Sequence, residues 1–285
     1  MLAGPCSCER RRSLSISSEQ TLAQDLVHDL VQDLAVECRD LGKAYQFYRR
    51  PIDQVKQVLL GGKRRYYDEY WALKEIGFAI PKGAAVGIVG RNGSGKSTLL
   101  QILCGITAPT VGTLTVKGRI APVLALGAAF DYELTGRENC YLSGAILGLK
   151  RAQVAERLPA IQELCGLGDF FEQPVKLYSS GMGARLAFAI CAHADGDVLI
   201  VDEALAVGDD AFRERCRTLI RAFRQRGTIL FVSHDLDQVA ELCERTIWID
   251  RGRLRADGET HAVIRDYRKA LAEEADDPNR FAFMT

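Results

Sequence analysis

The sequence has no apolar run long enough to cross a membrane, no excess of charge of either sign and no segment typical of a secretory signal. A transmembrane helix needs about 20 predominantly apolar residues, whereas the most apolar stretches here, Val198–Val201 and Thr228–Val232, have the length of strands. At the N-terminus three arginines follow a short apolar start, which is the reverse of the order in a signal peptide. We therefore expect a cytosolic chain that reaches a membrane only through a partner.

The charges and the cysteines exclude further classes of protein. The 37 basic and 37 acidic side chains cancel, so we expect no nucleic-acid partner. Nine cysteines are an odd number and most are scattered singly, which argues against a disulfide framework. Cys6 and Cys8 form a pair, but no further ligands stand at the spacing of a metal site. The chain of 285 residues, 47% hydrophobic and 26% charged, has the composition of a globular protein with one large core or two modest domains.

Residues 1–34 form a predicted N-terminal extension of the main domain. Apolar residues repeat there at helical spacing and acidic residues lie on the other face: Leu22, Leu26, Leu30 and Leu34 against Asp25, Asp29 and Asp33. The acidity argues against a helix on a lipid surface, since such helices are usually basic. We favour a helix packed on its own domain or a partly disordered segment, and the alternative is a helix that docks on a partner.

Beyond residue 34, strand-length apolar runs alternate with helical patterns. We expect strands at Ala35–Leu41, Leu73–Ile80, Ala84–Val89, Val198–Val201 and Thr228–Val232, and a hairpin of Thr246–Ile249 and Arg253–Ala256 about Gly252. We expect helices at Ile52–Leu60, Glu138–Leu149, Ala152–Leu164, Met182–Ala192, Asp210–Gln225 and Leu236–Cys243. This alternation predicts an α/β fold with a largely parallel sheet, helices on both faces and an inserted helical subdomain.

The strongest single motif is the run Gly90, Arg91, Asn92, Gly93, Ser94, Gly95, Lys96, Ser97 and Thr98. It fits the phosphate-loop pattern and stands between an apolar strand and an apolar helix. Its glycines allow successive N–H groups to form an anion-binding nest at the helix N-terminus. We expect Lys96 to reach the β- and γ-phosphates of ATP and Ser97 to ligate Mg²⁺. A glycine-rich turn without a ligand does not account for the Lys-Ser-Thr triplet at this place.

Three further candidate residues stand at or just after the ends of two strands that should reach the same edge of the sheet, where ligands bind in such folds. Asp202 and Glu203 close the strand Val198–Val201, and His234 follows the strand Thr228–Val232. We expect Asp202 to hold Mg²⁺ through water and Glu203 to be the general base for the attacking water, a role typically worth about 10²–10⁴ in rate. His234 is expected to hydrogen-bond the γ-phosphate.

The run Tyr178, Ser179, Ser180, Gly181 and Met182 opens an apolar helix. Serines are good N-caps, and a capped helix N-terminus carries roughly half a positive charge, which suits a phosphate. Taken alone, the run would indicate only a capped helix.

The order of these parts resembles the ATP-binding cassette of ABC transporters, with Asp209 in the position of the D-loop. The resemblance covers about residues 35–270. It implies a P-loop fold with an N-terminal antiparallel β portion, a nucleotide-binding domain at 35–275, a helical subdomain at 136–195 and a tail at 276–285. It also implies a homodimer in which each ATP lies between the phosphate loop of one copy and Ser179, Ser180 and Gly181 of the other. Tyr45 looks like the aromatic residue that stacks on adenine, with Phe47, Tyr48 or Trp71 as substitutes.

Longer stretches are similar to one subfamily, the ATPases of exporters for O-antigen, capsular polysaccharide and teichoic acid. They are Leu134–Asn139, Gly144–Leu149, Asp202–Asp209, Thr246–Trp248 and Arg50–Lys56, the last resembling an early insertion near the membrane partner. The resemblance implies an ATP-hydrolysing subunit, peripheral on the cytoplasmic face of the inner membrane, that drives an ABC-2 type permease moving a lipid-linked polysaccharide. The alternatives are a cassette of a drug or lipid exporter and a soluble ABC ATPase outside transport.

The sequence departs from the family pattern in two places. No glutamine lies between Gln101 and Gln153, where most cassettes carry one, and the region reads Leu124, Ala125, Leu126 and Gly127. The helix-opening run has Ser180 and Met182 where glycine and glutamine are commoner.

Overall fold

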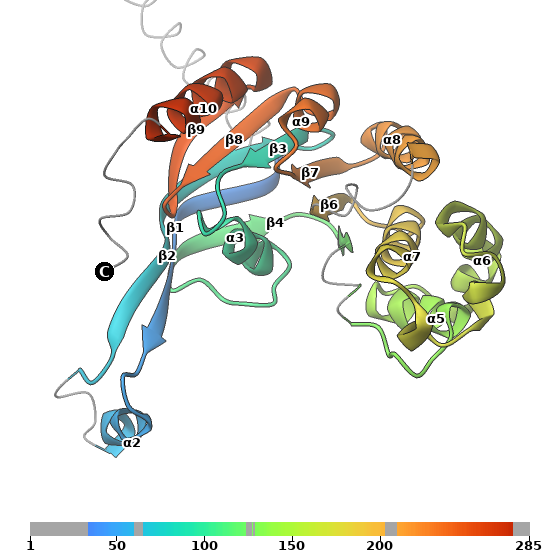
Figure 1. Ribbon diagram of the computed structural model, residues 1–285, viewed down its shortest axis with the longest axis horizontal. Helices are drawn as coiled ribbons and strands as arrows, with labels where there is room; N and C mark the ends of the chain where they lie inside the picture. The colour runs from blue at the N-terminus through green and yellow to red at the C-terminus, as the bar shows by residue number, and fades with distance from the viewer. Residues whose placement is uncertain (1–33, 60–64, 124–126, 128, 203–209, 276–285) are drawn as a thin grey trace, which may run out of the picture. The chain divides into compact units, whose positions relative to one another are not determined.

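The structure is a computed structural model that describes residues 34–59, 65–123, 127, 129–202 and 210–275 (Figure 1). The chain divides into two units at Leu34, and the description below concerns the second, Ala35–Thr285. Its strands form a six-stranded sheet and a three-stranded sheet.

The larger sheet has the strand order β5-β6-β7-β3-β8-β9. Its strands are β5 (Ile120–Pro122), β6 (Val198–Asp202), β7 (Thr228–Val232), β3 (Ala85–Val89), β8 (Arg245–Asp250) and β9 (Arg253–Glu259). The first five are parallel, and β9 turns back antiparallel to β8. Every residue of β3 and β7 is buried, which explains their unbroken apolar sequences. The carboxyl ends of β6, β7 and β3 therefore lie side by side.

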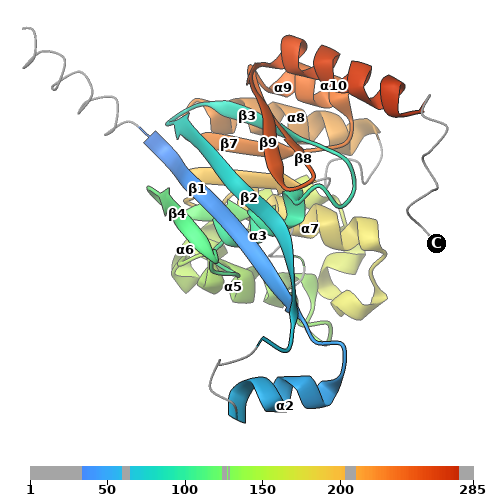
Figure 2. The ribbon, with the colours of Figure 1, turned by 90° about the vertical axis from the view of Figure 1, so that its left-hand side faces the viewer.

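The smaller sheet has the order β2-β1-β4. It consists of β1 (Leu34–Phe47), β2 (Asp68–Pro81) and β4 (Val111–Val116). β1 runs antiparallel to β4, with Cys38 opposite Leu114. Figure 2 shows α2 (Pro51–Leu59) at the far end of β1 and β2, and no residue of this helix is buried.

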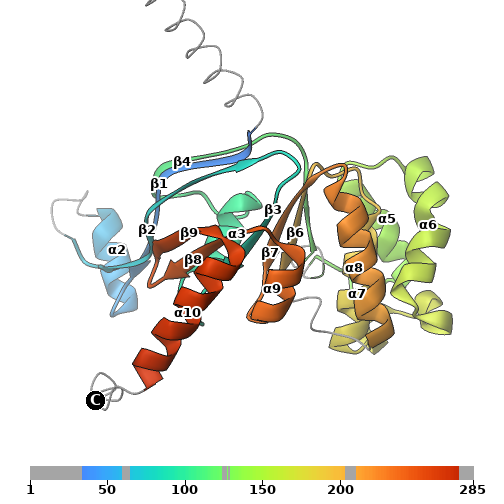
Figure 3. The ribbon, with the colours of Figure 1, turned by 90° about the horizontal axis from the view of Figure 1, so that it is seen from above.

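The helices fall into groups by position. The helix α3 (Lys96–Leu103) follows β3, and α5 (Gly136–Ile146), α6 (Arg151–Cys165) and α7 (Ser180–Ala192) pack side by side (Figure 3). The remaining helices are α8 (Asp210–Arg224), α9 (Leu236–Leu242) and α10 (Thr260–Ala275), and two short 3₁₀ turns cover Gly168–Glu172 and Val175–Leu177. A capping box starts α5, because the Thr135 side chain accepts the Glu138 N–H and the Glu138 carboxylate accepts the Thr135 N–H.

Two hydrophobic clusters use opposite faces of the larger sheet. Val86 and Ile88 pack in a cluster with residues of β1, β2 and α3, whereas Ala85 and Val89 pack in a cluster with residues of α7, α8 and α10. The alternation follows from the two-residue period of a strand. Packing on both faces fixes β3 and so positions the loop that follows it.

The predicted fold class is confirmed, including the antiparallel β portion and the helical insertion. β4 and α10 are elements that were not predicted from the sequence. β4 is mostly exposed and contains Gly112, so its pattern is weak. In α10, Val263, Ile264 and Tyr267 are buried at helical spacing, a signal that was present but not used. The limits 35–275 and 136–195 stay predictions, and among the described residues no helix is long and apolar enough to span a membrane.

Candidate functional site

The loop between β3 and α3 makes two close approaches that require glycine. Gly90 has φ 155°, and a Cβ there would stand 2.2 Å from the carbonyl oxygen of Ile249 in β8. Gly95, the N-cap of α3, has φ 106°, and a Cβ there would stand 2.7 Å from the carbonyl oxygen of Ala72 in β2. Any larger residue would push the loop away from one of the two sheets, so the sequence demands glycine at both ends of the loop.

Lys96 begins α3 and is buried inside the curve of this loop. Its side chain is only 9% exposed, and its Nζ donates hydrogen bonds to the carbonyl oxygens of Gly90 at 2.6 Å and Arg91 at 2.9 Å. The loop thereby holds an ammonium group at the N-terminus of a helix, where backbone N–H groups also attract an anion.

A cavity of about 470 Å³, here named the loop cavity, adjoins the loop and α3. It is lined by Tyr45, Tyr70, Ala72, Asn92, Gly93, Gly95, Lys96, Ser97, Thr98, Asp202 and Val232. The cavity therefore joins aromatic side chains of the smaller sheet to the carboxyl ends of β6 and β7. Its volume lies within the range usual for small-molecule sites, roughly 300–1,000 Å³.

Asp202 reaches the loop cavity because β6 and β7 are in register. Asp202 pairs with Val232 at the carboxyl ends of these strands, and both residues line the cavity. Ser97 lines the same cavity from α3, so a hydroxyl and a carboxylate share it with Lys96. Oxygen donors of this kind fit a hard cation such as Mg²⁺. Glu203 and Asp209 lie outside the described residues, as do residues 124–126 of the segment without glutamine.

His234 emerges from β7 at the same edge of the sheet. It is exposed and is not among the residues that line the loop cavity. The turn around it is fixed, because the Ser233 hydroxyl accepts the Asp235 N–H and the Asp235 carboxylate caps α9 through the N–H groups of Asp237 and Gln238. The predicted contact of His234 with a phosphate stays a prediction.

Arg91 and Ser94 differ from the other residues of the loop. Arg91 does not line the loop cavity but a second cavity beside α10. Ser94 is buried, and its backbone N–H donates to the Arg91 carbonyl oxygen at 3.1 Å. Their predicted contacts with a nucleotide therefore have less support from the geometry than those of Asn92, Gly93 and Gly95.

The helix α7 begins at the predicted place. Ser179 is its N-cap, and the Ser179 Oγ accepts the N–H of Met182 at 3.3 Å. Ser179 and Ser180 are exposed and Gly181 is half-buried, and none of the three lines the loop cavity. Tyr178 is tied down instead: its hydroxyl donates to the Phe170 carbonyl oxygen at 2.7 Å, and burial raises its pKa to about 12. The N-terminus of α7 is therefore exposed and takes no part in lining the loop cavity of its own chain.

The aromatic lining of the cavity was only partly foreseen. Tyr45 lines it, as expected, but Phe47, Tyr48 and Trp71 do not. Tyr70 lines it from β2 with 55% of its surface exposed, and sequence reasoning missed it. The sequence shows aromatic residues in both β1 and β2 near α2, but it does not show which of them reach the cavity, since that depends on how the two strands lie beside each other.

Comparison with known proteins assigns a family to this arrangement. The family model described as ABC transporter matches residues 73–206. The chain is 44% identical over 235 residues to the O-antigen export system ATP-binding protein RfbB of Klebsiella pneumoniae, covering 81% of this chain and 96% of that protein. The chain belongs to the ATP-binding proteins of ABC transporters.

Further proteins similar to this ABC protein are also transport or export proteins by name. It is 43% identical over 244 residues to the ABC transporter protein AbcA of Aeromonas salmonicida, covering 85% of this chain and 79% of that protein. It is 38% identical over 251 residues to the teichoic acids export ATP-binding protein TagH of Listeria innocua, covering 88% of this chain and 74% of that protein.

Solved structures support the fold of this ABC protein. A structure of the ATP-binding subunit of an ABC transporter matches with a TM-score of 0.66 and 20% identity, covering 82% of this chain and 93% of the other. A dimeric ATP-binding cassette in a post-hydrolysis state, bound to ADP and phosphate, also has a TM-score of 0.66 at 20% identity, covering 79% and 98%. The predicted family membership is confirmed, and the role of each site residue stays a prediction.

Proposed function

We propose that this chain binds and hydrolyses ATP as a subunit of an ABC exporter for a lipid-linked polysaccharide. The observation that carries the proposal is the loop cavity, where Lys96, Ser97 and Asp202 lie together with Tyr45. Lys96 supplies positive charge to the β- and γ-phosphates, and the N–H groups of the loop donate hydrogen bonds to the remaining phosphate oxygens. Tyr45 stacks on the adenine at the other side of the cavity.

Mg²⁺ fits the oxygen donors of the same cavity. Ser97 and Asp202 would hold it, Asp202 through water. The described residues contain no group of three or more His, Cys, Asp or Glu that could hold a metal by itself. That suits Mg²⁺, which is usually bound through one or two carboxylates together with phosphates and water. When bound, the ion supplies positive charge to the phosphate oxygens.

Hydrolysis needs groups at the γ-phosphate, and the sequence offers two. Glu203, directly after Asp202, accepts a proton from water while the water oxygen bonds to the γ-phosphorus and the bond to the β–γ bridging oxygen breaks. The products are ADP and phosphate. His234, at the end of the adjacent strand, donates a hydrogen bond to the γ-phosphate, and Asp209 contacts the partner copy. Glu203 and Asp209 lie outside the described residues, so these roles rest on their place in the sequence.

A second copy of the chain completes the site. The tip of α7 is capped and outward-facing, and it does not line the cavity of its own chain. A helix N-terminus of this kind suits phosphate. We infer that Ser179, Ser180 and Gly181 cover the nucleotide bound by the phosphate loop of the other copy, so that ATP closes a homodimer and hydrolysis reopens it.

The membrane partner is an integral permease of the ABC-2 exporter type, and this chain lies peripherally at the cytoplasmic face of the inner membrane. The names of the relatives support an export role and a glycan as cargo, carried through the permease. Exposed aliphatic side chains on α2 support a partner for this helix: Ile52, Val55, Val58 and Leu59 are each more than half exposed. Apolar surface of this kind marks an interaction site rather than a solvated face.

The test in solution uses the Glu203→Gln variant. With ATP and Mg²⁺ we expect it to bind nucleotide, stop turning over and accumulate as a dimer, measured by light scattering after gel filtration. The wild type should hydrolyse ATP and return to monomer. Rapid hydrolysis by the variant would reject Glu203 as the base, and a variant that stays monomeric at high concentration would reject the two-copy site.

The test of the cargo is made in cells. Deletion of the gene should abolish the surface polysaccharide, and the wild-type gene should restore it whereas Glu203→Gln should not. Normal surface polysaccharide in the deletion strain would leave the ATPase chemistry standing but overturn the assignment to a polysaccharide exporter.

A further inference from the structure

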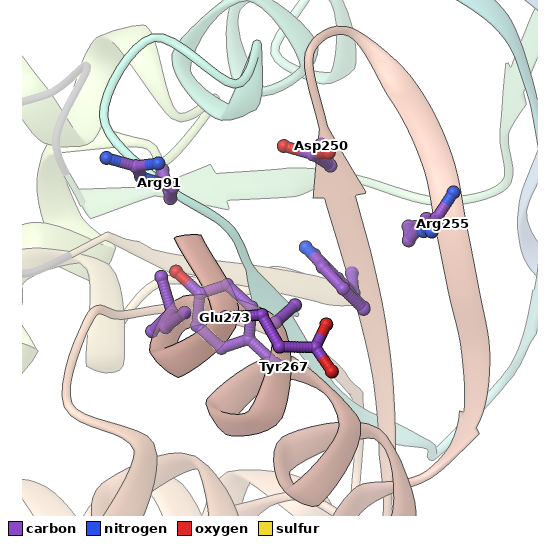
Figure 4. A pocket seen from close by; sticks show the side chains of 8 residues that line it. Arg91, Asp250, Arg255, Tyr267 and Glu273 are labelled. Carbon is purple, nitrogen blue, oxygen red and sulfur yellow. The ribbon is translucent and has the colours of Figure 1, made fainter. Parts of the chain in front are cut away.

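A second cavity, named here the α10 cavity, lies between the phosphate loop, the end of β8 and α10 (Figure 4). Its volume is about 260 Å³. Among the residues that line it are Arg91, Trp248, Asp250, Arg255, Tyr267 and Glu273. None of them lines the loop cavity, so the chemistry proposed for ATP makes no use of this place.

The floor of the α10 cavity is aromatic and firmly held. Trp248 and Tyr267 are each only 8% exposed, and their ring centroids are 5.3 Å apart. Trp248 pairs in the sheet with Val89, the last residue of β3 before the phosphate loop. The Arg255 guanidinium lies 6.0 Å from the Trp248 ring. The parts of the two rings that remain exposed give the cavity a small, rigid apolar floor, on which C–H groups of a ligand can pack.

The walls carry matched charges. Figure 4 shows Arg91 and Arg255 on opposite sides, with Asp250 between them and Glu273 in front. Guanidinium groups only donate hydrogen bonds, and carboxylates only accept them. An anionic ligand would meet two carboxylates and a cationic ligand two guanidinium groups. A hydroxyl group both donates and accepts hydrogen bonds, so it can bind the guanidinium groups as well as the carboxylates of the cavity.

We propose that the α10 cavity is a second binding site, which takes a neutral polyhydroxylated ring of monosaccharide size. C–H groups of the ring pack on the exposed part of the aromatic floor, and the arginine and carboxylate side chains bind its hydroxyl groups. This site is separate from the ATP site, because the two cavities share no lining residue.

The α10 cavity is joined to the phosphate loop by the backbone. Arg91 belongs to both, the Gly252 N–H donates to the Ser94 carbonyl oxygen at 2.9 Å, and Gly90 packs closely on Ile249 of β8. A ligand that draws Arg91 toward Asp250 therefore acts directly on the loop that holds the phosphates. We expect its binding to change the affinity for ATP by at least about twofold, within the range of ordinary coupling between sites.

The binding experiment uses the full chain and the fluorescence of Trp248. The sequence has two tryptophans, and Trp71→Phe leaves Trp248 as the only one. We expect a saturable fluorescence change with galactose, and a weaker response, by about tenfold or more, with the charged analogues galacturonate and galactosamine, as expected from the cost of an unpaired charge. Glucose and N-acetylglucosamine are further neutral probes, since the stereochemistry of the ring is not specified by the charges alone.

Matched variants locate the binding. Arg255→Ala and Asp250→Asn should each weaken the response at least about tenfold, the effect of losing one charge-assisted hydrogen bond. Arg265→Ala should not, because Arg265 is an exposed arginine of α10 that does not line the cavity. Thermal unfolding midpoints are compared to ensure that each variant is folded.

The outcomes separate this inference from the proposed function. The absence of a saturable response to every neutral sugar overturns the site, as does tighter binding of a charged analogue or an undiminished response in Arg255→Ala. ATP affinity is then measured by calorimetry with and without bound sugar in the Glu203→Gln background. Unchanged affinity overturns the coupling, and failure to bind ATP at all in the absence of sugar overturns the proposed function instead.

Discussion

We expect nucleotide binding to depend most on Lys96, because its Nζ lies inside the phosphate loop. Lys96→Ala should weaken ATP binding by about tenfold to a hundredfold, since a hydrogen bond to a charged group is worth about 1.5–3 kcal/mol. Calorimetric titration with ATP and Mg²⁺ measures the change. Lys82→Ala, an exposed lysine that does not line the loop cavity, is the control. Equal affinity in the two variants would contradict the role of Lys96.

Tyr45 and Tyr70 both line the loop cavity, and they differ in what is expected of them. Tyr45→Ala should weaken ATP binding by about 1–3 kcal/mol, the usual worth of stacking on a base, whereas Tyr45→Phe should stay near the wild type. Tyr70 packs edge to face on Phe47 at 6.2 Å, so Tyr70→Ala should have the smaller effect. Titration with ATP compares the three variants. A larger loss in Tyr70→Ala than in Tyr45→Ala would assign the base contact to Tyr70.

For single residues, spacing along the chain predicted some of the side chains that line the loop cavity and missed others. Ser97 and Asp202 share a cavity with Lys96 because parallel strands end at one edge, a rule that a sequence carries by itself. Arg91 belongs to the same motif yet lines a different cavity, because motif membership does not fix the direction of a side chain. Tyr70 was missed because its place depends on how β2 lies beside β1, and that pairing is a tertiary feature.

Among the elements, α5 depends on its capping box. Thr135→Ala should destabilise the protein by about 1 kcal/mol, the usual cost of losing an N-cap, and Thr135→Ser should restore most of it. The N–H and hydroxyl of Thr135 hold the pKa of Glu138 below its ordinary value. A depressed pKa stabilises the fold above the unfolded-state pKa, and this stabilisation is lost as the pH falls through the folded-state pKa.

The pH dependence distinguishes the box from a neutral cap. Urea unfolding from neutral to acid pH should show a shallower loss of stability in Glu138→Gln than in the wild type. Glu163→Gln, at an exposed glutamate of α6, is the matched control. Parallel curves for the wild type and Glu138→Gln would contradict the argument.

We expect the exposed apolar face of α2 to contact the permease. Val58 and Leu59 are 78% and 77% exposed, so replacing them removes no packing within the chain. Val58→Asp with Leu59→Asp should abolish co-purification with the permease and leave ATP binding by the isolated chain unchanged. Gln54→Asp, on the same helix, is a control for added charge. Undiminished co-purification would show that α2 is not the contact.

For the whole molecule, the two-copy arrangement is the main expectation. Ser180→Glu in the Glu203→Gln background should prevent the ATP-bound dimer while leaving nucleotide binding by the monomer, because a carboxylate then faces the phosphates of the partner site. Light scattering and calorimetry on the same samples separate the two effects. Thr218→Glu, on an exposed position of α8, controls for the added charge. A dimer that forms normally with Ser180→Glu would place the interface elsewhere.

The architecture as a whole was largely predictable, because two sequence patterns indicate its sheet and its helices. Buried parallel strands read as unbroken apolar runs, and the helical insertion has its own spacing and caps. The strand period places Val86 and Ile88 on one face of β3 and Ala85 and Val89 on the other, but which elements pack on each face was not predictable from the sequence, because it depends on tertiary contacts. The place of α10 beside the phosphate loop likewise depends on packing at long range.

Gly252 ties three stretches of the chain together at one turn. Its N–H bonds to the Ser94 carbonyl oxygen, its carbonyl oxygen accepts the Lys74 N–H at 2.7 Å, and a Cβ there would stand 2.6 Å from the Ala72 carbonyl oxygen. Segments fastened in this way melt together rather than one by one. A denaturation experiment should therefore show nucleotide affinity and the exchange protection of the β8–β9 hairpin vanishing in one cooperative step.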